Sequence, residues 1–414
     1  MIRTSDFRPN LCVQHFVAGV ASTVVTLVLT LLPAGTIADE LIVEKSVLFR
    51  ERSDGFTLYR IPGIVITSKG TVLVYCEARK FSDADRGEIE IHLRRSTDGG
   101  RTFSVAQQVA HRGPRLPRNP HLPDSKAGRS FGAPDEQTVN NPVAIASPSG
   151  PVHLVYCVEY MRVFHIRSDD DGLTWSAPVE ITSAFTEFRS ELEWQVIATG
   201  PGHAVEMQSG RLCVPFWMAD YQKDAPLGRA VGTVISDDGG ATWQRGEIAM
   251  TNAGEPNIAS LSDGGVLVTA RNSQPQNRRL MTRSIDGATK WSKPEFAEEL
   301  LEPGCMAGLI SYPGTHLTSG PMLLFSSPHT TRREHAARRD VTIHVSRDDG
   351  KTWPVSKVLQ AGPSAYSDLA VLPDGTVLCF YESGTDTPVI PRKRDWAYAT
   401  LTLARFPPEW IVSP

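Results

Sequence analysis

The stretch STDGGRTF at residues 96–103 decides the fold, because variants of it recur along the chain. These are SDDDGLTW at 168–175, SDDGGATW at 236–243, SIDGATKW at 284–291 and SRDDGKTW at 346–353. In this motif the aspartate can accept hydrogen bonds from turn N–H groups, glycine tolerates positive φ, and the aromatic ring can enter a neighbouring core. The motif therefore indicates repeated structural turns and not catalytic groups.

The spacing of these turns predicts the architecture. They lie about 50 to 70 residues apart, which suits one four-stranded antiparallel sheet per repeat. The intervening segments are strand-like, as in TVLVYCEA at 71–78, and no long helical period interrupts them. With an opening strand near 41–49 to complete the last sheet, we expect an all-β, six-bladed β-propeller. Ala288 and Lys290 replace glycine and threonine in the fourth turn, which should loosen it.

The N-terminal segment, residues 1–38, has the order of a secretory signal peptide. Arg3 and Arg8 precede an apolar run at 16–32, and small residues follow it. An uncleaved membrane anchor is the alternative, because the run approaches the length of a membrane-spanning helix. We therefore expect residues 39–414 to form one propeller domain that is secreted, periplasmic or held at the cell surface, with no other membrane insertion.

Charge and cysteine usage exclude several classes of function. The formal net charge of −4, with scattered basic residues, offers no footprint for nucleic acid. Beyond Cys12 in the leader an odd number of cysteines remains, and Cys76, Cys157, Cys213 and Cys379 lie in apolar runs, which favours buried free thiols. No cysteine or histidine spacing indicates a structural zinc site.

Charged side chains and a tyrosine gather beside strand-like runs between the repeated turns. In chain order they are Arg60; Arg79 with Asp83 and Asp85; Glu255 with Arg271; Arg338 and Arg339; and Tyr366 with Glu382. A residue before one strand and a residue at the end of its hairpin partner lie at the same end of the hairpin. Glu255 can therefore meet Arg271, and Tyr366 can meet Glu382. On a propeller this end is the axial mouth, so the pattern predicts one site there.

The Arg-Ile-Pro motif at 60–62, the repeated aspartate turns and the later glutamate, arginine and tyrosine segments together resemble the bacterial-type exo-α-sialidase (neuraminidase) family. The resemblance covers residues 42–414. It implies a six-bladed propeller that hydrolyses terminal sialic acid from glycans, glycoproteins or glycolipids with retention, and it implies no metal and no organic cofactor.

The resemblance also implies the catalytic residues. Tyr366 would be the nucleophile, Glu255 its partner and Asp85 the acid/base, with Asp83 as the competing acid. A sialoside carries a carboxylate on its anomeric carbon, which would repel an anionic nucleophile, and sialidases are known for a tyrosine in this role. An acid/base also needs a partly desolvated position, which we expect for the loop of Asp85.

The substrate-binding residues follow from the same resemblance. They would be the carboxylate-binding arginines Arg60, Arg271 and Arg338, with Arg339 competing with Arg338; Glu382, which orients Arg60; and Arg79, a further substrate contact. Guanidinium groups suit a carboxylate because they are planar, permanently charged forks. Met306 departs from the family pattern at a position where a polar residue is common, which leaves the side-chain contacts of the sugar open.

Other functions fit the same sequence. A non-catalytic propeller that binds sialylated glycans or a protein would need the arginines but not Tyr366. A glycosidase for a related acidic sugar, or a trans-sialidase, would use the same residues. Linkage preference and oligomeric state leave no signal in the sequence.

Overall fold

The computed structural model describes most of the chain after the leader. The described residues are 41–110, 113–121, 135–221, 228–272, 274–314, 321–332, 338–384 and 396–413. The predicted leader at 1–38 lies outside them. No helix within these ranges is long and apolar enough to cross a membrane. Residues from Leu41 onward cluster as one compact unit.

Within the described residues the strands form five β-sheets, of which four have four or five strands. The first has the order β2 (Leu58–Ile66), β3 (Val72–Arg79), β4 (Ile89–Ser96) and β5 (Gln107–Gln108). The second is β11 (Gly202–His203), β6 (Val139–Ala146), β7 (Val152–Val158), β8 (Arg162–Ser168) and β9 (Val179–Glu180). The third is β10 (Val196–Thr199), β13 (Leu212–Ala219), β14 (Arg229–Ser236) and β15 (Gln244–Thr251), with β12 (Val205–Glu206) on β13. The fourth is β16 (Ala253–Ser260), β17 (Val266–Asn272), β18 (Arg278–Ser284) and β19 (Glu295–Leu301).

The fifth sheet has seven strands. Its order is β1 (Glu44–Arg50), β25 (Thr400–Phe406), β24 (Val377–Ser383), β23 (Val355–Val371), β22 (Arg339–Ser346), β21 (Met322–Pro328) and β20 (Gly308–Tyr312). The 17-residue strand β23 pairs with β22 through its first part and with β24 through its second. The sheet thus consists of two four-stranded sets that share β23. As predicted, the opening strand completes the last set, because β1 pairs with β25.

Helices are short and lie beside the sheets. They are α1 (Ser183–Thr186), the 3-10 turn Glu187–Ser190 and α2 (Glu409–Val412). The all-β prediction is therefore confirmed.

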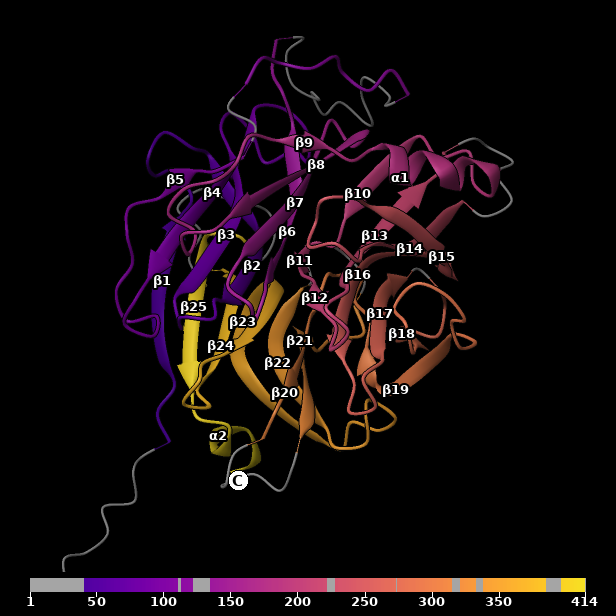
Figure 1. Ribbon diagram of the computed structural model, residues 1–414. Coiled ribbons are helices and arrows are strands. Elements are labelled where there is room, and N and C mark those ends of the chain that lie inside the picture. The colour runs from indigo at the N-terminus through magenta and orange to yellow at the C-terminus, as the bar shows by residue number, and fades with distance from the viewer. Residues whose placement is uncertain are drawn as a thin grey trace, which may run out of the picture. The chain divides into compact units, whose positions relative to one another are not determined.

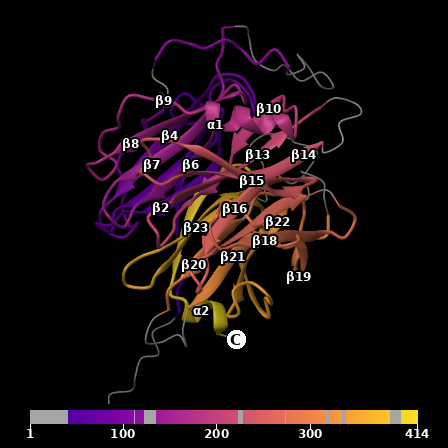
Figure 2. The same ribbon diagram turned by 45° about the vertical axis from the view of Figure 1, so that its right-hand side comes forward.

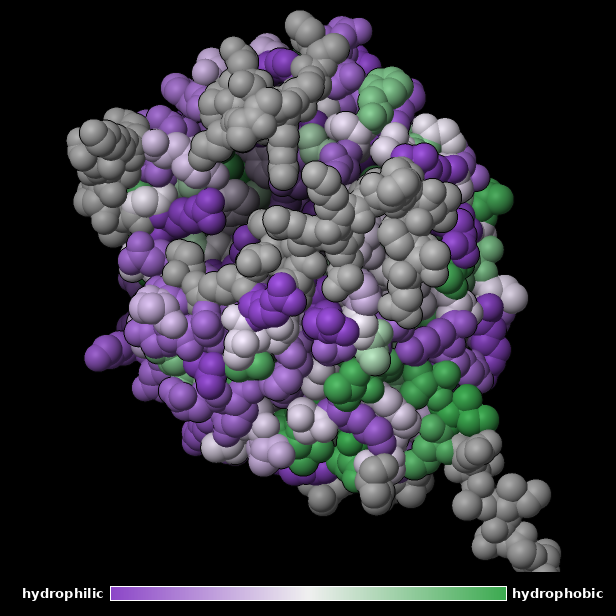
Figure 3. All heavy atoms as spheres, turned by 180° about the vertical axis from the view of Figure 1, so that it is seen from behind, coloured by the Kyte–Doolittle hydropathy of each residue, from purple (hydrophilic) through white to green (hydrophobic). Residues whose placement is uncertain are grey.

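One face of the molecule is mostly hydrophilic, with apolar residues gathered near one edge (Figure 3).

The strand sets follow one another around a common centre (Figures 1 and 2). In order, β2 contacts β6, β6 contacts β10, β13 contacts β16, β16 contacts β20, β20 contacts β23, and β23 contacts β2. These contacts close a ring of inner strands, which is a propeller-like arrangement. The active-site candidates lie on those inner strands and on the segments beside them.

The hydrophobic core lies between successive sheets. Val65 and Leu73 of the first sheet pack in one cluster with Leu154 of the second, while Val74 packs with Leu403 of the last. Because sheets are covered on both faces, strands such as β3 are buried along their whole length and are nearly continuous apolar runs. Each large buried aliphatic side chain contributes about 1.5–3 kcal/mol relative to an exposed one.

The repeated turns are closed by their own side chains. In the first, Ser96 Oγ donates to Asp98 Oδ1 at 2.7 Å and accepts the Gly100 N–H at 2.9 Å. Asp98 also accepts the N–H of Thr102 at 2.9 Å and its hydroxyl at 2.6 Å. The turns at Asp170, Asp238 and Asp348 repeat this bonding. These side chains stabilise the turns, as predicted.

The fourth turn keeps the same closure with a different spacing. Asp286 accepts the N–H groups of Ala288 and Thr289 at 2.9 and 2.7 Å, and the Thr289 hydroxyl at 2.6 Å. In the other turns the bonded threonine lies four residues after the aspartate. Thr289 lies three residues after Asp286 and makes the same bonds. The bonds that close this turn are kept despite Ala288 and Lys290, and the looser turn expected from the sequence stays a prediction.

The inner strands are bulged at one end. Register shifts interrupt the pairing at Ile61, Asn141 and Glu255, where φ is +61°, +53° and +43°, and again between Ser364 and Ser367. Side chains rarely adopt such positive φ values, which cost about 1–3 kcal/mol each. Bulges re-aim side chains and are frequent beside functional sites. All of these bulges lie at the same end of the inner strands, where Arg60, Glu255 and Tyr366 of the predicted site also lie.

Candidate active site

Tyr366 lies at the centre of a hydrogen-bonded group on β16, β17 and β23. Its hydroxyl donates to Glu255 Oε1 at 2.5 Å and accepts from Arg271 Nη1 at 3.1 Å. The same Arg271 nitrogen donates to Glu255 Oε2 at 2.7 Å. Arg271, near the end of β17, pairs with Gly254, near the start of β16. Arg271 therefore lies beside Glu255, as the sequence predicted.

Burial and charge push the pKa values of Tyr366 and Glu255 apart. Burial, reinforced by the charge of Glu255, raises the pKa of Tyr366 well above its usual value, although Arg271 and Arg338 oppose this. Burial alone would raise the pKa of Glu255, but Arg271 and the tyrosine hydroxyl outweigh it and lower that pKa. The resting pair is therefore a neutral tyrosine hydroxyl against a carboxylate.

Two further guanidinium groups flank the tyrosine ring. The Cζ atoms of Arg60 and Arg338 each lie 5.0 Å from the centroid of the Tyr366 ring, within the range of cation–π attraction. Tyr398 joins the group, because Arg60 lies 4.1 Å from its ring and Arg338 Nη1 donates to its hydroxyl at 3.2 Å. The three predicted arginines thus surround one tyrosine.

Arg338 differs from the other two arginines in lacking an acidic partner. It is 1% exposed and bonds to the Gly304 carbonyl oxygen and the Tyr398 hydroxyl, both neutral. Its Nε is buried without a hydrogen-bond partner, and no carboxylate among the described residues pairs with it. A buried, unpaired cation is costly, so this position favours an anionic ligand.

Glu382 fixes Arg60 and the backbone around it. Its carboxylate accepts Arg60 Nε at 2.8 Å and Nη2 at 3.0 Å, a bidentate pair. The same oxygens accept the backbone N–H groups of Ile61 at 3.2 Å and Tyr366 at 3.1 Å. One fully buried carboxylate therefore holds both the arginine and the segment that carries the tyrosine.

Asp85 lies in the loop between β3 and β4, at the edge of this group. Arg79 Nη1 donates to Asp85 Oδ1 at 2.9 Å and to the Asp83 carbonyl oxygen at 2.9 Å, and Arg60 Nη1 lies 4.0 Å from Asp85. The Asp85 side chain is 67% exposed, so the prediction that its loop is partly desolvated is wrong for the protein without a bound substrate.

The geometry bears on both alternatives left open by the sequence. The carboxylate of Asp85 bonds to Arg79, whereas Asp83 contributes a backbone oxygen. Arg338 lies over Tyr366, whereas Arg339 is 42% exposed and bonds to Asp340. Asp85, and not the side chain of Asp83, therefore lies at the group around Tyr366, and so does Arg338. The chemical roles of Asp85 and Arg338 stay predictions.

Several residues of the site were not predicted. Glu77 Oε2 accepts Arg79 Nε at 3.1 Å and Nη2 at 2.8 Å, and its Oε1 accepts the Asn141 N–H at 3.0 Å. Glu77 is fully buried, which raises its pKa despite Arg79. A lone acidic residue in the apolar run TVLVYCEA was a usable signal, because such a charge must be paired.

Arg279 was also not predicted from the sequence. It connects the segment that follows β19 with strand β16. Its Nη1 donates to Glu302 Oε2 at 2.7 Å and to the Cys305 carbonyl oxygen at 2.9 Å, and its Nη2 donates to Asn257 Oδ1 at 2.8 Å. Met306, which follows, is fully buried in an apolar cluster with Ile61 and Tyr366. Met306 therefore packs beneath the tyrosine group.

The five cysteines among the described residues are buried and free, in agreement with the sequence. Within the same residues no group of three or more histidine, cysteine or acidic side chains could hold a metal ion.

Comparisons with known proteins indicate the family of the chain. A family model described as a BNR repeat-like domain matches residues 125–379, more than half of the chain. A sialidase of Micromonospora viridifaciens is 32% identical over 80% of the chain, and one of Bacteroides fragilis (strain YCH46) is 30% identical over 80%. The chain belongs to the BNR repeat-like domain family.

The chain covers only part of the two relatives named above. It spans 51% of the Micromonospora protein and 61% of the Bacteroides protein. Among solved structures, Hadza microbial sialidase Hz136 is similar with a TM-score of 0.71 and 26% identity, over 89% of this chain and 69% of that one. The propeller-like arrangement is thus shared with a solved sialidase.

Proposed function

We propose that the chain is an exo-α-sialidase that hydrolyses terminal sialic acid from glycans, glycoproteins or glycolipids, with retention and with Tyr366 as the nucleophile. One observation carries the proposal: buried Arg338 lacks a carboxylate partner among the described residues and lies 5.0 Å from the ring of Tyr366, whose hydroxyl donates to Glu255. A sialoside presents a carboxylate on the carbon that must react. Arg60 and Arg271 supply two more guanidinium groups at the same place.

In the first half of the reaction, Tyr366 attacks the anomeric carbon. Its proton passes to Glu255 Oε1, to which the hydroxyl already donates at 2.5 Å. The bond from the anomeric carbon to the leaving oxygen breaks, and Asp85 gives that oxygen a proton. A neutral hydroxyl approaches the substrate carboxylate without the repulsion that an aspartate or glutamate would meet.

In the second half, water attacks the anomeric carbon of the glycosyl-tyrosine. Asp85 accepts a proton from the water, the bond to the tyrosine oxygen breaks, and Glu255 returns its proton to that oxygen. Asp85 is exposed in the protein alone, so the bound sugar would have to exclude water from it. Both steps together invert the anomeric centre twice, which gives retention.

A trapping experiment tests the nucleophile. A 2,3-difluorinated sialic acid has a good leaving group at C2, and its C3 fluorine slows both steps by disfavouring the oxocarbenium-like transition state. We expect intact-protein mass spectrometry to show one added sugar on the wild type, located on Tyr366 by peptide mapping, and none on Tyr366→Phe. Labelling of another residue, or no labelling of an active wild type, would refute the assignment.

The catalytic class is tested with a fluorogenic N-acetylneuraminic acid glycoside in the presence and absence of lactose. Release of free sialic acid is expected to dominate. Transfer to lactose in excess of hydrolysis would instead assign a trans-sialidase, and absence of any release between pH 4 and 8 would favour a binding propeller.

We also propose that the seven-stranded sheet acts as two blades that share β23, which makes six blades, and that residues 1–38 direct export. The separate pairing of β23 with β22 and β24 supports the first point. An experimental structure with another number of inner strands around the axis would overturn it. N-terminal sequencing of the exported protein tests the second, and a start after residue 38 is expected.

A further inference from the structure

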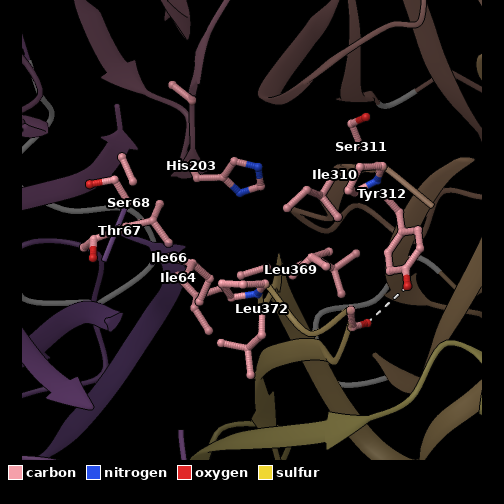
Figure 4. Close-up of a pocket in the computed structure, with 18 of the residues that line it drawn as sticks. Ile64, Ile66, Thr67, Ser68, His203, Ile310, Ser311, Tyr312, Leu369 and Leu372 are labelled. Atoms are coloured by element: carbon pink, nitrogen blue, oxygen red, sulfur yellow. Dashed lines mark hydrogen bonds between the residues drawn. The ribbon is translucent and has the colours of Figure 1, made fainter. Parts of the chain in front are cut away.

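A cavity lies at the end of the inner strands opposite to the group around Tyr366. Its volume is about 490 Å³, and the ends of β2, β20 and β23 line it mostly with aliphatic side chains. Figure 4 shows Ile64, Ile310 and Leu369 around it. Leu369 follows Tyr366 by three residues on β23, which places the cavity roughly 10 Å farther along the strand.

His203 lines this cavity together with the hydroxyl-bearing residues Thr67, Ser68, Ser311 and Tyr312 (Figure 4). It is 8% exposed, and its Nδ1 lies 2.8 Å from Asp368 Oδ1, while Asp368 Oδ2 accepts the Ile64 N–H at 3.0 Å. The other ring nitrogen, Nε2, bonds to none of the described residues. Figure 4 shows the His203 ring reaching in among the aliphatic side chains. His203 is thus a largely buried side chain that lines the cavity and leaves Nε2 open to a ligand.

The surroundings of His203 favour its protonated ring. Burial opposes the charge, but Asp368 outweighs burial and raises the pKa of His203. Two tyrosines lie nearby: Tyr75 on β3, whose hydroxyl donates to the Gly202 carbonyl oxygen at 2.6 Å, and Tyr312, which lines the cavity and donates to the Gly375 carbonyl oxygen at 3.3 Å. With Nδ1–H donated to Asp368, the protonated ring offers Nε2–H as a free donor.

Packed side chains separate this cavity from the tyrosine site. A Cβ on Gly202 would lie 2.9 Å from Met306 Cε and 3.4 Å from both Asn257 Nδ2 and Asp368 Oδ1. Met306 and Asp368 are fully buried. These atoms pack closely around Gly202, next to His203, and Met306 belongs to the same apolar cluster as Tyr366, so buried side chains lie between the cavity and the tyrosine site.

We propose that this cavity binds a small, largely apolar carboxylic acid, whose carboxylate accepts the His203 Nε2–H and whose chain lies along Ile64, Ile310 and Leu369. The volume is within the usual range of small-molecule pockets, which combine apolar walls with a few convergent polar groups. A polyhydroxylated sugar would leave those of its hydroxyl groups that face Ile64, Ile310 and Leu369 unpaired, which disfavours it relative to an apolar chain.

The test uses the full chain with sodium octanoate and 1-octanol as probes, in calorimetric titrations at pH 5.5. We expect saturable binding of octanoate, with a Kd of about 1 mM or tighter, and at least about tenfold weaker binding of octanol. Ile310→Trp should fill the cavity and abolish octanoate binding. The same substitution at Ile285, which is 60% exposed and outside the cavity, is the control and should leave binding unchanged.

Three outcomes would overturn the proposal: no saturable binding of octanoate, equal binding of octanoate and octanol, or unchanged binding in Ile310→Trp. Thermal unfolding of both variants shows that each is folded, and because this readout needs no turnover, the result is independent of the proposed catalytic function.

Discussion

Glu255 and Tyr366, separated by 111 residues in the chain, meet at 2.5 Å between carboxylate and hydroxyl oxygens. Glu255 stands at a bulge of β16, and Tyr366 lies in the bulged part of β23, so neither side chain has the direction that a regular strand would give it. The contact therefore depends on backbone irregularities at two inner strands of the ring.

Glu255→Gln should remove the proton acceptor while keeping the shape of the side chain. We expect kcat for a sialoside to fall by about 10²- to 10⁴-fold, the usual worth of a positioned acid or base. Binding of a carboxylate-bearing transition-state analogue should change far less, since the arginines remain. Steady-state kinetics and calorimetry measure the two effects, and an unchanged kcat would show that Glu255 is not the base.

Arg338→Ala should weaken the binding of a carboxylate-bearing analogue by about 10- to 100-fold, because a charge-assisted hydrogen bond contributes about 1.5–3 kcal/mol. Arg339→Ala is the matched control, since Arg339 is more exposed and bonds to Asp340. Calorimetric Kd values decide the matter. A larger loss in Arg339→Ala would mean that the neighbouring arginine binds the carboxylate.

Glu382→Gln should destabilise the fold as well as the site. It leaves Arg60 buried without its counter-charge, and breaking a buried ion pair costs about 3–5 kcal/mol. Glu193→Gln is a suitable comparison, because Glu193 forms an exposed pair with Arg189 and should cost less than about 1 kcal/mol. Urea unfolding measures both, and equal losses would contradict the role given to Glu382.

Two buried histidines should make stability fall in acid. His153 Nδ1 lies 3.0 Å from His165 Nε2, and burial lowers the pKa of both from 6.5 to about 4. Their contribution is complete above pH 6.5, where the unfolded chain is also neutral, and is lost as the pH falls towards 4. His165→Phe should therefore flatten the loss of unfolding free energy between pH 7 and 5. A slope equal to that of the wild type would refute this.

The fourth repeated turn should be as important as the others. Asp286 makes the same set of bonds to Thr289 that Asp170 makes to Thr174, so alanine at either aspartate should cost a similar 1–3 kcal/mol, about the penalty of leaving its donors unpaired. Thermal unfolding of the two variants compares them. A negligible loss in Asp286→Ala alone would favour the looser turn expected from the sequence.

Much of the fold and site could be predicted because turn and hairpin chemistry is local. The aspartate turns indicated one sheet each, and hairpin geometry brought Arg271 to Glu255 and Glu382 to Tyr366. What escaped were contacts between sheets. Tyr398 acquires its role only when its segment meets Arg338, 60 residues away in the chain, and Glu77 reaches the next sheet only through the Asn141 N–H, contacts that no local pattern encodes.

The bulges had a signal that was not used. Ile61, Asn141 and Glu255 each have positive φ and each precedes a proline. Proline has no N–H for the ladder, so within a strand it is confined to edges and bulges. The prolines therefore mark where pairing breaks, although the sequence gives no indication of which way the neighbouring side chain then turns.

The pairing of β1 with β25 has a kinetic consequence. Glu44 and Arg405, 361 residues apart, form an ion pair across these strands, so the ring cannot close until almost the whole chain is available. Loop-closure entropy grows with separation, and such non-local pairings fold slowly. During synthesis the first strand must wait for the last, and until they join, the unpaired edge of β25 is open to any other extended chain.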